Sequence, residues 1–201
     1  IAPVYTYADI EKNEKAGKKR RKRVNYELIQ EILVWIIQIM IVCALAFGIV
    51  WYFGHKVSTV GDSMSPQLKN GDVTLINRLV YDVRKPKRGE VIAFKPNGNE
   101  NSHYYIRRVI GLPGETIEYK DGRLWIDGEE LEEKYETTEI VELGLLKDEI
   151  KLDGDEYFVL CDDRENSEDS RVANIGNVKR NEITGKVWFV VSPMKHFGFV
   201  K

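Results

Sequence analysis

The pattern of hydrophobic and polar positions changes sharply near residue 54. Residues 32–54 form an apolar run of 23 residues, ILVWIIQIMIVCALAFGIVWYFG, in which Gln38 is the only strongly polar side chain. As an α-helix this run would be about 35 Å long, which is enough to cross a hydrocarbon core of roughly 30 Å. Trp51 and Tyr52 near its end suit a membrane–water interface. The pattern therefore predicts a single transmembrane helix over residues 32–54.

Two other interpretations of the apolar run stay open. One is a buried core helix, although 23 uncharged residues are long for such a helix. The other is a cleaved signal peptide, because Ala44-Leu45-Ala46 is a small-x-small sequence of the kind found at cleavage sites. The chain stays apolar from Phe47 to Phe53, however, and this favours an uncleaved anchor.

After residue 54 the sequence consists of short runs rich in Val, Ile, Tyr and Phe, separated by Gly, Pro and Asp. Such runs are typical of strands, and Asp121-Gly122 predicts a tight hairpin between two of them. Tyr135 to Ile150 has no clean period and is expected to be an insertion or a long loop. The predicted fold is mainly β, with strands at Val73 to Ile76, Glu90 to Phe94, Tyr104 to Ile110, Thr116 to Lys120, Arg123 to Asp127, Glu156 to Cys161 and Lys186 to Val191.

Composition and charge divide the chain further. With 43% hydrophobic and 31% charged residues, the 201-residue chain is neither fully disordered nor a polytopic membrane protein. Residues 1–31 hold eight basic residues, including the run Lys18 to Arg23, against five acidic ones, whereas residues 55–201 hold 22 basic and 27 acidic residues. The positive-inside rule then predicts a basic cytoplasmic segment over 1–31 and an extracytoplasmic domain over 55–201. We interpret the basic run as this topology signal and expect no nucleic-acid partner.

The two cysteines are too few for a disulfide scaffold. Cys43 lies in the apolar run and Cys161 lies far downstream, so no intrachain disulfide is expected. Cys161 is expected to be a small packed residue rather than a nucleophile, because the neighbouring Asp162 and Asp163 would raise its pKa.

The first candidate for chemistry is Ser63, in Gly61-Asp62-Ser63-Met64-Ser65-Pro66. Glycine lets the backbone turn tightly and leaves the serine approachable. Taken alone this sequence is most often a turn, and a nucleophilic serine needs a base from elsewhere. A Ser-His-Asp arrangement stays open, although nothing marks His55, His103 or His196 as its member.

From Ile32 to the end, the chain resembles the bacterial type I signal peptidases, which are membrane-anchored Ser-Lys proteases that remove signal peptides from exported proteins. The resemblance implies an antiparallel-sheet catalytic domain behind the single transmembrane helix, and no cofactor. It rests on boxes that occur in order: 61–66, Gly71-Asp72-Val73, Arg88 to Ile92, Tyr105 to Glu115, Asp162 to Arg171 and Gly185 to Phe189.

By this resemblance Ser63 is the nucleophile, and its backbone amide, together with the position of Gly61, forms the oxyanion hole. Ser167 would hydrogen-bond the general base, while Asp169 and Arg171 would form a supporting ion pair. Residues 162–171 also contain many acids, but they lack the glycine and the acid spacing of a calcium loop, so no metal is expected.

The resemblance also implies the substrate. Met64, Leu68, Tyr105 and Ile106 match positions that shape shallow pockets for small side chains, although each of them could equally pack in the core. The expected partners are signal peptides of exported pre-proteins, cut after Ala-x-Ala, and the cytoplasmic membrane. The substrate would lie as an added strand beside the one that carries Tyr105 and Arg107.

The chain departs from the family at position 107, where an arginine stands in place of the general-base lysine. Lowering the pKa of a lysine from about 10.4 to about 7 costs roughly 4.6 kcal/mol, whereas arginine would need roughly 7.5 to 9 kcal/mol. Arg107 is therefore a poor base. Arg108 has the same defect and alternates to the other strand face, and His103 is about 13 Å away along a regular strand.

Two hypotheses follow. The chain is either a signal peptidase with an altered base or an inactive relative that binds exported proteins as a scaffold. Ser63, Ser167, Asp169 and Arg171 favour the first, and Arg107 favours the second. A soluble SOS-repressor type of Ser-Lys autoprotease has a similar nucleophile box, but the anchor and the last box argue against it.

Overall fold

The computed structural model describes residues 6–53, 55–99, 101–165 and 168–200. The chain divides into two compact units, residues 1–50 and residues 51–201.

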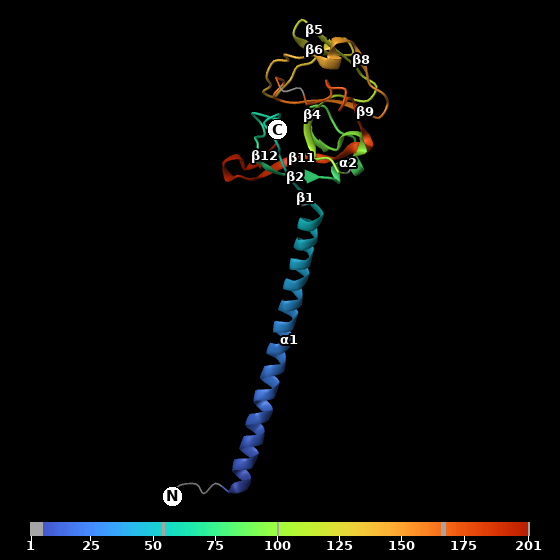
Figure 1. The fold of residues 1–201 in the computed structure, drawn as a ribbon. Coiled ribbons are helices and arrows are strands. Elements are labelled where there is room, and N and C mark those ends of the chain that lie inside the picture. The colour runs from blue at the N-terminus through green and yellow to red at the C-terminus, as the bar shows by residue number, and fades with distance from the viewer. Residues whose placement is uncertain (1–5, 54, 100, 166–167, 201) are drawn as a thin grey trace. The chain divides into compact units, whose positions relative to one another are not determined.

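The first unit consists mainly of the long helix α1, which runs from Tyr7 to Phe53 (Figure 1). Its stretch Tyr26–Gly48, 23 residues with a mean hydropathy of 2.3, is long and apolar enough to cross a membrane, and none of it is buried. Within this unit no other element covers the apolar stretch, as expected for a membrane anchor rather than for a helix buried in its own unit. The helix also continues through the basic segment, which sequence analysis had not assigned to a helix. Lys, Arg and Glu favour helices but leave no apolar stripe there to signal one.

The second unit is a β domain built on two antiparallel sheets (Figure 1). The larger sheet has the order β1-β2-β11-β3-β4-β9-β10, with β12 paired to β11. Its strands are β1 (His55–Ser58), β2 (Val73–Asn77), β3 (Val91–Phe94), β4 (Tyr105–Gly111), β9 (Glu156–Leu160), β10 (Val178–Lys179), β11 (Ile183–Ser192) and β12 (Gly198–Phe199). The smaller sheet has the order β7-β6-β5-β8, from β5 (Thr116–Lys120), β6 (Arg123–Ile126), β7 (Glu129–Glu130) and β8 (Ile150–Lys151).

Helices are short in this domain. They are the four-residue α2 (Val80–Val83) and the 3-10 turns η1 (Pro96–Gly98), η2 (Gly144–Lys147), η3 (Arg180–Glu182) and η4 (Met194–His196). The mainly antiparallel β fold is confirmed, and each of the seven predicted strands is present within three residues of its expected bounds. The hairpin at Asp121-Gly122 is confirmed as well, since both residues have positive φ, 51° and 79°, as a type I′ turn requires.

Three hydrophobic clusters hold the domain together, and one of them bears directly on the site. It joins Met64 and Leu68, in the loop between β1 and β2, to Ile76, Ile106 and Val187 in the larger sheet. Each of these side chains is at most 3% exposed. Burial of a large aliphatic side chain stabilises by about 1.5 to 3 kcal/mol, so these contacts fix the loop against β4.

Candidate active site

Ser63 lies in the loop that joins β1 to β2, and the loop is closed at its base by backbone hydrogen bonds. Thr59 N–H donates to Asp72 O over 2.8 Å, and Gly71 N–H donates to Thr59 O over 3.0 Å. The tip is tied to the segment after β9, because Asp163 N–H donates to Ser63 O over 3.0 Å. Ser63 itself is 5% exposed, so its hydroxyl is held in a fixed place.

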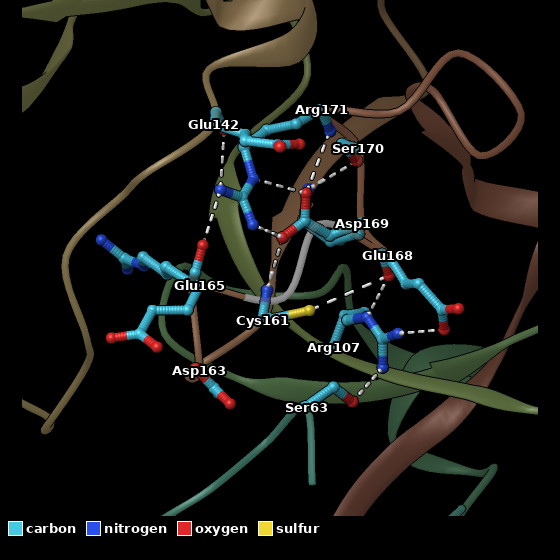
Figure 2. Close-up of polar contacts among 12 residues, drawn as sticks. Ser63, Arg107, Glu142, Cys161, Asp163, Glu165, Glu168, Asp169, Ser170 and Arg171 are labelled. Carbon is cyan, nitrogen blue, oxygen red and sulfur yellow. Dashed lines mark hydrogen bonds and ion pairs between the residues drawn. The ribbon is translucent and has the colours of Figure 1, made fainter. Parts of the chain in front are cut away.

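Arg107 lies on β4 and reaches the serine directly. Its Nη1 donates to Ser63 Oγ over 2.9 Å and to the carbonyl oxygen of Ile106 over 2.6 Å. Its Nε donates to the carbonyl oxygen of Glu168 over 2.7 Å (Figure 2). The guanidinium carbon is 5.3 Å from the centre of the Tyr105 ring. Ser63 and Arg107 are therefore in contact, although they lie 44 positions apart in two different sequence boxes.

Arg108, the next residue of β4, is buried on the opposite face, as strand alternation requires. It forms a bidentate ion pair with Asp162, with Nε–Oδ1 and Nη2–Oδ2 distances of 2.7 and 2.6 Å. Burial raises the pKa of the Asp162 carboxyl above its usual range, because the hydrogen bonds from Arg108 offset only part of the desolvation. Arg108 is thereby committed to a structural contact and does not face Ser63.

A second buried ion pair supports the same wall of the site. Asp169 and Arg171 are joined at 2.8 and 2.9 Å, and both side chains are fully buried (Figure 2). Asp169 Oδ2 also accepts the N–H of Cys161 over 3.0 Å, and the Arg171 guanidinium reaches the carbonyl oxygens of Glu142 and Arg164. The pair thus fixes the residues that follow β9 to the segment containing Glu168, whose carbonyl oxygen holds Arg107.

Cys161 is buried beside this pair. Burial raises the pKa of its thiol to about 12, and the Asp169 carboxylate adds to the rise. The buried, unreactive thiol that the sequence predicted is what the structure has, although desolvation and Asp169 replace Asp162 and Asp163 as the main causes.

A cavity of about 260 Å³ opens beside Ser63 and Arg107. Its wall combines apolar and polar side chains, and it is lined by Thr59, Val60, Ser63, Ser102, His103, Tyr104, Tyr105, Ile106, Arg107 and Glu168. Of the four expected pocket residues, Tyr105 and Ile106 line it, whereas Met64 and Leu68 are fully buried in the hydrophobic cluster described above. His103 lines the cavity because the chain leaves the strand pattern before Tyr105.

The remaining predicted residues are placed as follows. Gly61 has a φ of +81°, a conformation that favours glycine, and its N–H donates to Asn70 Oδ1 over 3.2 Å. Ser167 lies outside the described residues. Sequence reasoning had not singled out Glu168, which lines the cavity and whose carbonyl oxygen accepts a hydrogen bond from Arg107. The only feature of the sequence that could have pointed to Glu168 as a site residue was its position between Ser167 and Asp169.

The chemistry of this arrangement is unusual in one respect. A serine nucleophile needs a neighbour that accepts its hydroxyl proton, and a guanidinium has five N–H donors and no acceptor. The hydrogen bond at 2.9 Å therefore runs from Arg107 to Ser63. The site has the serine and the basic neighbour of a Ser-Lys type hydrolase, with the direction of the hydrogen bond reversed.

Comparison with known proteins identifies the family. Residues 32–192 match the family described as signal peptidase, peptidase S26. A signal peptidase I P of Bacillus subtilis subsp. natto is 32% identical over 191 residues, covering 92% of this chain and 98% of the relative. A signal peptidase IB of Staphylococcus aureus (strain COL) is 33% identical over 187 residues, covering 84% and 93%. The solved structure of a signal peptidase I from Enterococcus faecalis V583, 34% identical, covers 52% of this chain and 97% of its own, with a TM-score of 0.41.

The chain therefore belongs to the signal peptidase family, peptidase S26, a family of serine peptidases. The matches bear out the resemblance and favour the peptidase over the scaffold hypothesis. Signal peptidases I act on the signal peptides of exported proteins at the membrane, and the apolar stretch of α1 suits a membrane anchor.

Proposed function

We propose that this chain cuts exported pre-proteins after Ala-x-Ala at the outer face of the cytoplasmic membrane, with Ser63 as the nucleophile and an altered group at the general-base position. The observation that carries the proposal is the hydrogen bond of 2.9 Å between Arg107 Nη1 and Ser63 Oγ at the wall of the cavity. It joins the two boxes that define nucleophile and base in the family.

The first chemical step is attack of Ser63 Oγ on the carbonyl carbon of the scissile peptide bond. Arg107 holds Oγ in position but accepts no proton, so the hydroxyl proton passes to water in the cavity. General base catalysis typically contributes a factor of about 10² to 10⁴. The chain therefore turns over slowly for a member of its family.

The oxyanion that forms during attack needs hydrogen-bond donors already in place. The Ser63 N–H has no hydrogen-bond acceptor among the residues that the structure describes, and it is the donor we assign. The Gly61 N–H is engaged with Asn70, so Gly61 contributes its turn and its small size rather than a free donor.

The substrate strand has an open edge to pair with. On the side of β4 that faces β9, pairing begins at Arg108, which is opposite Leu160. Over the described residues, Tyr105 to Arg107 therefore have no strand on that side, and an extended peptide can add there. The small side chains that precede the scissile bond would enter the cavity and pack against Val60, Tyr105 and Ile106 in its wall.

The membrane topology is part of the proposal. The basic run Lys18 to Arg23 precedes the apolar stretch, which supports a cytoplasmic N-terminus and an extracytoplasmic β domain. Signal peptides inserted in the same membrane then present their cleavage sites on the side where Ser63 lies.

The test is cleavage of an Ala-x-Ala pre-protein by the full chain in detergent, followed by gel electrophoresis over long incubation. The unaltered chain should yield the mature protein slowly, and Ser63→Ala should abolish the product. Ser65→Ala is the matched control, because Ser65 lies in the same loop and only its backbone is hydrogen-bonded, to Asp62 O over 2.8 Å. Cleavage that survives Ser63→Ala would refute Ser63 as the nucleophile.

A further inference from the structure

The guanidinium of Arg107 has hydrogen-bonding capacity left over. Nε donates to Glu168 O, and the two N–H groups of Nη1 donate to Ser63 Oγ and Ile106 O. Within the described part of the chain, Nη2 has only a distant ion pair with Glu168 Oε2, at 3.9 Å. Among these residues the two N–H donors of Nη2 have no acceptor within hydrogen-bond distance, and Arg107 lines the cavity.

The charge of Arg107 is also poorly compensated. The Arg107 side chain is 5% exposed, whereas the Glu168 side chain is 72% exposed. The Glu168 carboxylate is therefore largely solvated and compensates the buried charge only weakly. A buried cation without a close counter-ion is costly, and the cost is relieved by any anion that fits beside it. Hydrogen bonds from a guanidinium to a carboxylate are charge-assisted and stronger than neutral ones, so a single carboxylate oxygen at Nη2 would offset this cost.

The cavity around these donors restricts the anion that fits. Ser63 lies beside Arg107, while Val60, Tyr105 and Ile106 supply apolar wall. The β4 edge from Tyr105 to Arg107 is open to an extended peptide, as described above. A peptide paired there with its last residue at Ser63 would place its terminal carboxylate next to the Arg107 guanidinium, which contacts Ser63 Oγ.

We propose that Arg107 makes this cleft a binding site for the free C-terminal carboxylate of a peptide that ends in a small residue. This inference rests on the proposed function, since the peptide that fits is the product of cleavage. When the ester with Ser63 forms, the scissile C–N bond breaks, and the mature protein leaves as an amine that takes up the proton lost by Oγ. In the final step water attacks the ester, the bond between the acyl carbon and Oγ breaks, one proton of the water goes to Oγ, and the other is lost to solvent. The signal peptide then ends in a carboxylate, which Arg107 retains, so its release is slow.

The Glu168 carboxylate competes with this ligand. It is the acidic group at 3.9 Å from Nη2, and a bound carboxylate would take its place. Glu168→Gln removes both the competing charge and its repulsion of the ligand, while the backbone carbonyl that holds Nε stays. This variant should therefore bind the carboxylate peptide more tightly than the unaltered chain does.

The experiment uses a fluorescein-labelled peptide ending in Ala-Gln-Ala, prepared as the free acid and as the C-terminal amide. Binding to the full chain in detergent is followed by fluorescence anisotropy at pH 7. The acid should bind roughly ten- to a hundred-fold more tightly than the amide, the range expected for a charge-assisted hydrogen bond. Arg107→Gln should remove the difference, and Glu168→Gln should increase it.

Equal binding of acid and amide, binding of neither peptide, or a preference for the acid that survives Arg107→Gln would overturn the inference. The proposed function is tested separately by Ser63-dependent cleavage. A chain that cleaves but binds both peptides alike refutes only the carboxylate site. A chain that prefers the acid but never cleaves refutes only the proposed function.

Discussion

At the residue scale, arginine and lysine differ in the one property that a general base requires, the ability to become neutral and accept a proton. A buried lysine can lose its proton and accept another from serine, whereas arginine stays charged in proteins. The contacts of the Arg107 guanidinium agree with this chemistry, because within the described part of the chain its short hydrogen bonds are donated, to Ser63 Oγ and to two carbonyl oxygens. Arg107 therefore holds Ser63 Oγ in place, and in the proposed function it does so without activating it.

The buried pair of Asp169 and Arg171 supports a prediction at the same scale. Asp169→Ala would leave the Arg171 guanidinium buried without its carboxylate partner, and it would remove the acceptor of the Cys161 N–H. The free energy of unfolding should fall by about 3 to 5 kcal/mol. Chemical unfolding of the full chain in detergent, followed by tryptophan fluorescence, measures this change.

Asp155→Ala is the matched control for this variant. The Asp155 side chain is exposed, and only its carbonyl oxygen accepts a hydrogen bond, from Arg180 N–H, so the change should stay within about 0.5 kcal/mol. A loss below about 1 kcal/mol for Asp169→Ala would contradict the supporting role that we assign to the pair.

Residue identity predicts some of these contacts and not others. The boxes around Ser63 and Arg107 implied that the two residues meet, and the structure has the contact. The pattern could not tell whether Met64 and Leu68 line the pocket or fill the core. That outcome depends on how the loop between β1 and β2 folds back, and apolar side chains suit both places.

At the scale of elements, the longer strands that carry the core were predictable from the sequence, whereas the short strands were not. Runs of four or more alternating or apolar residues marked every strand that carries the core. The strands β7, β8, β10 and β12 were missed because two residues are too few for a period of two to be recognised. The four-residue β1 was missed because Val57 is its only apolar residue and the other three are exposed. Their pairing is decided by neighbouring strands rather than by their own sequence.

Glu90 joins three elements at the start of β3, and its ionisation predicts a pH dependence. Burial by itself raises the pKa of this carboxyl, but hydrogen bonds from Arg84, the Lys87 N–H and Lys186 outweigh burial and lower the pKa to about 2. Because the pKa is lower in the folded than in the unfolded chain, the stabilisation is present above about pH 5 and is lost as the pH falls towards 2.

The expected loss is on the order of 2 to 3 kcal/mol between pH 6 and pH 2.5, measured as the free energy of unfolding. Glu90→Gln should be less stable at pH 6 and should lose correspondingly less on acidification. Glu129→Gln, at an exposed position on β7, should follow the unaltered chain. An equal loss on acidification in Glu90→Gln and in the unaltered chain would show that Glu90 is not the group responsible.

On the scale of the whole molecule, the proposed function assigns a different task to each unit, anchoring to α1 and cleavage to the β domain. From the change in hydrophobic pattern the sequence predicted a membrane-spanning helix over residues 32–54 and a β domain after it. The structure has an apolar stretch at Tyr26–Gly48 and a β domain in different units. The sequence did not predict that the helix begins at Tyr7, because its charged N-terminal part has no apolar stripe. The β domain alone holds Ser63, Arg107 and the cavity.

The central claim is that the whole chain is a signal peptidase limited by the residue at position 107. The most direct measurement is kcat/KM for an Ala-x-Ala pre-protein, compared between the unaltered chain and Arg107→Lys in the same detergent. The lysine variant should be faster by a factor of about 100 or more, and its rate should rise with pH as the amine loses its proton. An unaltered chain that cleaves as fast as Arg107→Lys, with activity lost in Ser63→Ala, would contradict the account.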